Sequence, residues 1–455
     1  MPDPDEEHHR NDHTYGDDGP RDGGLHGATP LQAMTPAGAR LVRLAERHAA
    51  EAAREAERHD REGRYVEAGM QAMRDSGFLG GCAPPRFGGI GARSLHDLMV
   101  AVSRLARGCA STAICAHMHL TGVWRRTALW EAAAGNGAPD AGEHAELLRL
   151  LASGDLLAAG AAGEPGGVWC APFTEAVPVT GGYLVTGAKT FVTNAEAADT
   201  ISVTVRVPGR DGVYRHGVAE VVPGQPGVTV GTGFDALGMR GSGSQDLRLE
   251  GCFVPERRLT LGDPVGVPTA EELTHTATAN FALAGVGLGI AESARALAVE
   301  HARTARRPPA PGALAEQPAV HQEVAEMDIG LLAMRGALSH AGRAMDETIG
   351  DGTRIPAPAA IWALTADWQS AKLLVNRTAA EITRRAMAVC GGRAFLARSP
   401  LARLYRDVTA GTFMQPLAAL DAAPFIGRVG LGLDPFGAER EALAALGRTP
   451  GRGAP

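Results

Sequence analysis

The sequence predicts an α+β protein in which a β-domain lies between two helical regions. Three successive patterns along the 455 residues support this prediction. Apolar residues recur with helical spacing over residues 35–153, and short β-branched runs separated by glycine pairs replace them over residues 154–268. Long amphipathic segments return over residues 269–435. We therefore expect an N-terminal helical domain, a central antiparallel β-barrel-like domain and a C-terminal four-helix bundle.

The two ends of the chain differ in composition from the regions between them. Residues 1–34 are rich in glycine, aspartate and histidine and have almost no apolar periodicity. Such a segment cannot bury enough surface to offset the entropy cost of ordering, so we predict a disordered tail. Residues 436–455 are predicted to form a C-terminal tail.

Composition and charge argue against several functional classes. The formal net charge of −7 gives no reason to expect binding to nucleic acid or to a membrane surface. No uninterrupted apolar run reaches about 18 residues, and the polar N-terminus does not resemble a secretory signal. The six cysteines form no C-x-x-C pair and suit neither a zinc site nor a disulfide framework. The sequence therefore predicts no metal site and a cytoplasmic location.

Four motifs follow one another along the chain: "AGEPGG" at 162–167, "GYLVTGAKTFVTN" at 182–194, "LGMRGSGSQDLRLEGCFVP" at 237–255 and "CGGRAFLARSPLARLYRD" at 390–407. In this order and spacing they resemble the acyl-CoA dehydrogenase superfamily, over nearly all of the chain after the N-terminal tail. The resemblance implies the helical, β and helical-bundle domains of that family, and it implies a flavin cofactor.

The resemblance also implies which residues bind the flavin. Phe191 would pack against the flavin ring system, and Thr193 would form a hydrogen bond near its N5 atom, with Val192 between them. An aromatic wall excludes water, and a hydroxyl beside N5 can stabilise charge as the flavin gains electrons. Glu164 and Gly166 would form the turn beneath the flavin.

A second group of cofactor residues is implied in the helical bundle. Gly391, Gly392 and Arg393 match the turn that approaches the dinucleotide part of a flavin held by a neighbouring subunit, which implies a homotetramer. The family's Arg-x-x-Phe-Gly segment should follow His301, but the chain reads "ARTARRPPAP" there. FAD and FMN therefore both remain open.

The position of the family's catalytic base holds an amide. In acyl-CoA dehydrogenases, a glutamate on the loop after Arg-Asp removes the α-proton of the thioester, and the matching residue here is Gln415. An amide cannot act as a general base near neutral pH. Some relatives carry the glutamate on the first bundle helix, where Asn280 is the nearest polar residue, and Asp421 lies six residues beyond Gln415.

Two enzymatic functions remain under consideration, and a catalytically inactive binding protein is a third alternative. Oxygenation by reduced flavin and O₂ needs no such base, so our leading interpretation is a monooxygenase that acts on a small metabolite such as an amino sugar or amine. The C-terminal motifs look most like those of the amino-sugar nitrososynthases in the same superfamily. The alternative is an acyl-CoA or acyl-carrier-protein dehydrogenase, of which "EPGG" and "KTFVTN" are more typical. No Gly-x-Gly-x-x-Gly motif follows a strand, so a monooxygenase would need a separate flavin reductase.

Further residues are candidates for the substrate pocket. His117 lies on a segment that lines the substrate cavity in the family, where it could assist proton transfer; His119, two positions on, points to another face of the helix. An ordinary structural histidine is the alternative. The resemblance places Ser242 and Ser244 where relatives have a hydroxyl near the substrate or the flavin, with turn hydrogen bonding as the alternative. Two more residues are predicted to contact the substrate: Trp169 and Phe413.

Overall fold

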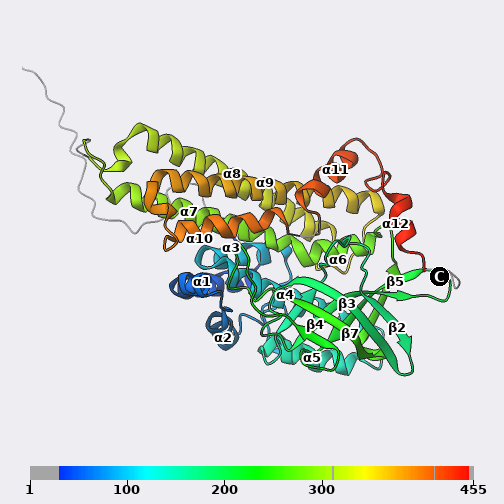
Figure 1. Cartoon of the computed structure of the whole chain (residues 1–455). Helices are drawn as coiled ribbons and strands as arrows, with labels where there is room; N and C mark the ends of the chain where they lie inside the picture. The colour runs from blue at the N-terminus through cyan, green and yellow to red at the C-terminus, as the bar shows by residue number, and fades with distance from the viewer. Residues whose placement is uncertain (1–29, 310–311, 415, 450–455) are drawn as a thin grey trace, which may run out of the picture.

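The structure is a computed structural model that describes residues 30–309, 312–414 and 416–449, and its regions follow the predicted order (Figure 1). Five helices precede the sheet: α1 (Pro36–Glu62), α2 (Glu67–Asp75), α3 (Leu95–Gly108), α4 (Ala110–Gly135) and α5 (Ala141–Ser153). The α3 helix is apolar on almost every face because it lies between α1 and the C-terminal bundle. The first helical domain and the bundle therefore share one continuous core.

The central domain is one eight-stranded sheet in the order β6-β7-β3-β2-β4-β5-β8, with β1 beside β4. Most neighbours are antiparallel, as predicted, but β1 and β2 each run parallel to β4. The sheet is therefore mixed, because β1 enters from α5 and does not reach β4 through a hairpin. The strands are β1 (Ala158–Ala161), β2 (Glu175–Val179), β3 (Gly182–Val192), β4 (Thr200–Pro208), β5 (Tyr214–Val221), β6 (Val228–Val230), β7 (Gln245–Pro255) and β8 (Leu259–Pro264).

Alternating side chains give the sheet a core of its own. Along β4 every second residue is buried, as expected for a strand with one covered face. These side chains form a cluster with those of β3 and β7 that is separate from the helical core. The long β3–β7 pair ends at Val192↔Gln245, directly beside α4 and the loop before β7. The candidate site is built on this end of the pair.

The C-terminal helices form the bundle that closes the site. The long helices α7, α8 and α9 lie side by side, and α6, α10 and α11 pack against α9 (Figure 1). One stretch, Ala270–Thr304, is long and apolar enough to span a membrane by composition, but 67% of its apolar window is buried inside the protein. The bounds are α6 (Ala270–Asn280), α7 (Ala284–Thr304), α8 (Pro318–Thr348), α9 (Pro358–Cys390), α10 (Pro400–Thr409) and α11 (Ala419–Gly430).

Parts of both predicted tails lie among the described residues. Most of the predicted N-terminal tail, residues 1–29, lies outside the described residues, but Met34 N already donates to Asp97 Oδ1 on α3 at 2.7 Å. The predicted C-terminal tail contains α12 (Arg440–Leu446). Its Leu443 is buried, and Gly447 O accepts from Tyr214 N of β5 at 2.8 Å. Apolar side chains on one face of this short helix fix it to the sheet, although the surrounding composition is rich in glycine and arginine.

Candidate flavin and substrate site

The predicted flavin-facing segment lies at the end of β3, where the backbone leaves the sheet. Phe191 and Asn194 both have left-handed backbones, with φ of 55° and 71°. The Asn194 side chain holds this turn, since its Nδ2 donates to Cys115 O at 2.9 Å and its Oδ1 accepts from the Tyr65 hydroxyl at 3.0 Å. A positive φ in an aromatic residue persists only where neighbouring contacts impose it. Here those contacts link β3 to α4 and to the loop after α1.

Phe191 presents its ring to the surface. The side chain is 71% exposed, and its ring meets the edge of Phe234 at a centroid distance of 6.5 Å. A large apolar ring held outward by a rigid turn offers a flat surface for another planar group. The residues at this end of β3 therefore fit a flavin ring, with the Thr193 hydroxyl next to it.

Thr193 belongs to a buried group of hydroxyls. Its Oγ1 lies 2.9 Å from Ser244 Oγ, which in turn lies 2.7 Å from Ser242 Oγ. All three side chains are almost inaccessible to solvent. The two serines, predicted to contact the substrate, thus lie behind Thr193 and contact it directly or through each other.

Glu164 stabilises the turn after β1. Its carboxylate accepts hydrogen bonds from Phe173 N, from Thr174 N and from the buried Lys189 ammonium, the last at 2.6 Å. Burial alone would raise the pKa of this carboxyl, but Lys189 and the hydrogen bonds hold the pKa below its ordinary value. Lys189 is on β3, so the ion pair fixes the turn at Gly166 (φ 67°) against the strand that carries Phe191.

Trp169 follows this turn and is partly buried against the helical core. Its neighbour Cys170 is buried, and burial raises the pKa of that thiol to about 12. The short antiparallel bridge between Val168 and Ala171 brackets both residues. The segment after the flavin turn thus lies between the sheet and the helices.

The two histidines of α4 have different surroundings. His119 has a partner on each ring nitrogen, because Nε2 lies 3.0 Å from Leu151 O and Nδ1 accepts from Ala158 N at 3.1 Å. His117 is fully buried, and neither of its ring nitrogens has a partner within the described part of the chain. Burial lowers the pKa of His117 to about 3, so the ring is neutral at physiological pH. His119 is a structural residue, whereas His117 has unused hydrogen-bonding capacity.

The Arg406–Asp407 pair holds the loop before β7. Asp407 is buried and accepts from Met239 N at 2.7 Å, and Arg406 binds Asp60 of α1 through both terminal nitrogens. Gly238 has no room for a Cβ, which would lie 2.4 Å from Arg406 O. The pair therefore joins α1, α10 and the loop that carries Ser242.

The loop after α10 is held from α9 through its main chain. Lys372 Nζ donates to Met414 O at 2.6 Å and to Leu417 O at 3.0 Å, and Asn376 Nδ2 donates to Gly411 O at 2.6 Å. Phe413 lies between these anchors with its side chain 74% exposed. Gln415 lies outside the described residues. The anchors bind carbonyl oxygens, so they do not depend on which side chains the loop carries.

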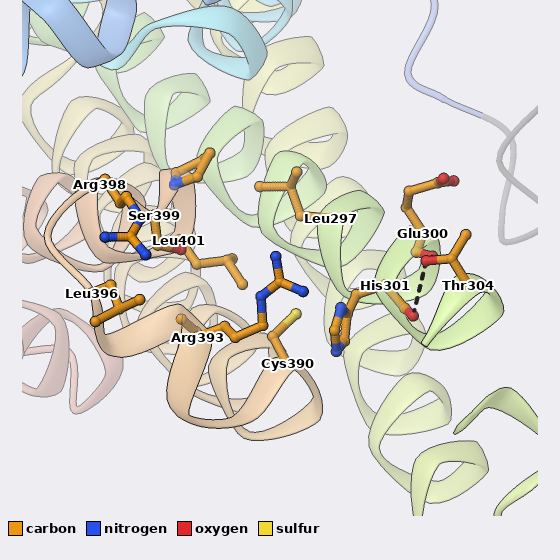
Figure 2. Close-up of a pocket in the computed structure, with 12 residues that line it drawn as sticks. Leu297, Glu300, His301, Thr304, Cys390, Arg393, Leu396, Arg398, Ser399 and Leu401 are labelled. Atoms are coloured by element: carbon orange, nitrogen blue, oxygen red, sulfur yellow. Dashed lines mark hydrogen bonds between the residues drawn. The ribbon is translucent and has the colours of Figure 1, made fainter. Parts of the chain in front are cut away.

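The predicted glycine turn forms one wall of a separate pocket. Gly391 ends α9 with φ of 65°, and Gly391–Phe395 then forms a 3₁₀ turn. A pocket of about 490 Å³ lies between this turn and α7. Figure 2 shows Arg393 and His301 reaching the same space from the α9–α10 connection and from α7. Arg393 has no ion-pair partner among the residues that the structure describes, so this wall can attract an anionic group.

Sequence reasoning missed the residues that hold the site in place. Lys189 and Asp407 stand inside recognised motifs, but their partners come from other motifs. Lys372 and Asn376 are one helical turn apart on α9, and a lone lysine in the apolar segment "AKLLVNR" was the signal for them. A lysine among apolar residues needs acceptors, which the sequence alone does not identify.

Comparison with known proteins identifies the family of this chain. Residues 39–131, 169–252 and 281–415 match the N-terminal, middle and C-terminal domains of acyl-CoA dehydrogenase. The fold and the site define a flavin-dependent oxidoreductase. The chain belongs to the acyl-CoA dehydrogenase superfamily, as the four sequence motifs had indicated.

Among its relatives are amino-sugar nitrososynthases. The chain is 35% identical to amino sugar nitrososynthase DnmZ of Streptomyces peucetius over 404 residues, which cover 88% of this chain and 94% of the relative. A solved structure of KijD3 with FMN and dTDP-3-amino-2,3,6-trideoxy-4-keto-3-methyl-D-glucose has a TM-score of 0.79 at 32% identity and covers 89% of this chain and 96% of that one. A nitrososynthase from Micromonospora carbonacea var. africana has a TM-score of 0.78 at 30% identity, with 88% and 98% covered.

Proposed function

We propose that this protein is a flavin-dependent monooxygenase that oxidises the amine nitrogen of a small metabolite, with a nucleotide-linked amino sugar as the substrate class. The observation that carries the proposal is the combination of an amide at position 415 with similarity to nitrososynthases over 88% of the chain. In the first oxidation one atom of O₂ bonds to the nitrogen, and the other leaves as water with two electrons and two protons. Bound reduced flavin supplies those electrons and activates O₂.

The residues of the site have defined roles in this proposal. Phe191 covers the flavin ring and keeps water away from it. Thr193 holds a hydrogen bond at the reactive edge of the ring. The buried neutral His117, whose ring nitrogens have no partner among the described residues, is a candidate to hold a polar group of the substrate by a hydrogen bond. Gln415 and Phe413 belong to the loop that Lys372 and Asn376 anchor, where an amide can bind a polar substrate without removing a proton.

Reduced flavin has to come from outside the chain, so the proposal includes a separate flavin reductase as a partner. It also includes binding of either FMN or FAD. We further propose that Gly391, Gly392 and Arg393 approach the phosphate end of a flavin held by a neighbouring subunit in a homotetramer. Arg393, which has no ion-pair partner within residues 30–309, 312–414 and 416–449, lines the pocket of Figure 2 and supports this placement.

The test is oxygen uptake with an external reductase. Purified protein with FMN or FAD, NADH, a flavin reductase and a dTDP-linked amino sugar should consume O₂ in proportion to N-oxidised product, measured by mass spectrometry. Gln415→Glu should lower the product formed per O₂ consumed, because it introduces a carboxylate that must be desolvated near the reactive edge.

The dehydrogenase alternative predicts a different result. Under anaerobic conditions, an acyl-CoA would bleach the absorbance of oxidised flavin as a double bond forms. Robust bleaching by the unmutated protein would overturn the monooxygenase proposal, since it would reveal another residue that removes the α-proton. Failure to bind either flavin at tens of micromolar would refute the cofactor assignment itself.

A further inference from the structure

The three buried hydroxyls of Thr193, Ser244 and Ser242 form a chain with one open end. Thr193 Oγ1 and Ser244 Oγ are 2.9 Å apart, and Ser244 Oγ and Ser242 Oγ are 2.7 Å apart. The Ser242 side chain is completely buried, and that of Thr193 is 6% exposed. The chain therefore begins inside the protein and ends at the surface on which Phe191 stands.

The backbone between the two serines fixes this arrangement. Gly243 has φ of 55°, and a Cβ there would lie 2.8 Å from a ring carbon of Tyr65. Only glycine fits both restrictions. Because the turn at Gly243 is rigid, the two serine hydroxyls stay within hydrogen-bonding distance.

The burial of Ser242 determines the direction of the hydrogen bonds. Among the described residues, Ser244 Oγ is the only group in reach of the Ser242 hydroxyl. A buried donor left without an acceptor costs about 1–3 kcal/mol, so Ser242 donates to Ser244. Ser244 then donates to Thr193, and the Thr193 proton points out of the chain.

We propose that Ser242 and Ser244 are positioning residues that orient the Thr193 hydroxyl as a hydrogen-bond donor toward flavin N5, so that the site favours oxidised over reduced flavin. This inference rests on the flavin part of the proposed function. N5 of oxidised flavin is an acceptor, and it matches an outward donor. Two-electron reduction places a proton on N5, which then faces a second donor. Either the Thr193 hydroxyl turns away from N5, or all the hydrogen bonds between the three hydroxyls reverse their direction. Both arrangements leave one hydroxyl proton without an acceptor.

The experiment measures flavin affinity in both redox states. Dissociation constants for oxidised and dithionite-reduced FMN are determined anaerobically by titration, and the midpoint potential is recorded with a reference dye. Thr193→Val should weaken binding of oxidised FMN about fivefold, the effect of one hydrogen bond, and change binding of reduced FMN less than twofold. Such a change corresponds to a rise in potential of about 20 mV for a two-electron couple.

Variants of the serines separate positioning from a general structural role. Ser244→Ala should weaken the binding of oxidised FMN about threefold, because it removes the hydrogen bond that orients Thr193. Ser242→Ala should weaken this binding less. Ser244→Thr keeps a hydroxyl and should restore the unmutated values. Thr186→Val, on the outer face of β3, is the matched control and should change neither constant.

Two results would overturn the inference. Equal weakening of oxidised and reduced FMN by Ser244→Ala would show that the serine only maintains the loop. If Thr193→Val and Ser244→Ala leave the affinities for oxidised and reduced FMN unchanged, the three hydroxyls do not reach the flavin. A shifted potential without amine oxidation would leave the inference standing and refute the proposed reaction, whereas absence of flavin binding would refute both.

Discussion

Lys372 allows a quantitative test of how the loop after α10 is held. The ammonium is buried on α9 and donates to Met414 O and Leu417 O. Burial lowers the pKa of Lys372 from 10.5 to about 8. That difference corresponds to a cost of about 3 kcal/mol for keeping the ammonium charged in the folded protein at pH 7.

Replacing the lysine by methionine removes this cost and creates another. The carbonyls of Met414 and Leu417 lose a donor, at about 1–3 kcal/mol each when buried. We therefore expect the effect of Lys372→Met on the free energy of unfolding at pH 7 to lie between a gain of about 1 kcal/mol and a loss of about 3 kcal/mol. The same variant should make the loop at residues 411–417 more sensitive to limited proteolysis, because its main-chain anchor is gone.

The pH dependence distinguishes the two contributions. Between pH 8 and 10.5 the unfolded chain binds a proton at Lys372 that the folded chain has released, so the free energy of unfolding rises with pH in this window. The penalty is absent above pH 10.5 and fully present below pH 8. The free energy of unfolding of the unmutated protein should therefore rise by about 1.4 kcal/mol for each pH unit in this window, relative to that of Lys372→Met.

Urea unfolding followed by tryptophan fluorescence at pH 7, 8, 9 and 10 measures this difference. Asn376→Leu is the matched control, since it removes the Gly411 anchor of the same loop without a titrating group. Its effect on the free energy of unfolding should be independent of pH. If the difference in free energy of unfolding between the unmutated protein and Lys372→Met is also independent of pH across this range, the burial of a charged lysine is refuted.

Three further predictions concern other parts of the structure. Burial lowers the pKa of His117 to about 3. The free energy of unfolding of the unmutated protein should therefore fall by about 2 kcal/mol between pH 6.5 and 5, relative to that of His117→Phe. The same difference in urea midpoint between the two proteins at pH 7 and at pH 5 would contradict this. Asp407→Ala should destabilise the protein by about 2 kcal/mol in urea unfolding through loss of the Met239 N bond, whereas Asp421→Ala, at an exposed position, should have almost no effect. Deleting residues 1–29 should leave the melting temperature and flavin binding unchanged, and extending the deletion to Met34 should lower the melting temperature by roughly 2 °C through loss of the bond to Asp97.

The sequence predicted the parts of the fold that depend on local pattern. Glycine pairs and β-branched runs marked the sheet, and "KTFVTN" located the end of β3 where Phe191 and Thr193 lie. The parallel pairing of β1 and β2 with β4 could not be predicted, because strand order depends on contacts between distant segments. The docking of α12 could not be predicted for a similar reason, since it depends on contacts of two leucines, Leu443 and Leu446, with residues distant in the sequence.

Contacts between residues of different motifs could not be predicted from the sequence. Asp407 and Met239 are 168 residues apart in the sequence, so no local pattern links the Arg-Asp pair to the loop before β7. Glu164 was expected to serve the flavin turn, but the number and direction of its bonds, including the one to Lys189, are visible only in three dimensions. The hydroxyl chain behind Thr193 likewise depends on the turn at Gly243.

The anchors suggest why one fold can accommodate both dehydrogenase and monooxygenase chemistry. Lys372 and Asn376 bind main-chain oxygens on both sides of position 415, so the loop path is set independently of the residue at that position. Thr193 and Phe191 are fixed by Asn194 and by the Glu164–Lys189 pair, which also lie away from the loop. Under the proposed function, a change from carboxylate to amide at 415 would remove a general base and leave in place the residues proposed to face the flavin. Under the proposed function, the reaction would then depend on the hydrogen bond that Thr193 offers at N5 and on the substrate that the pocket admits.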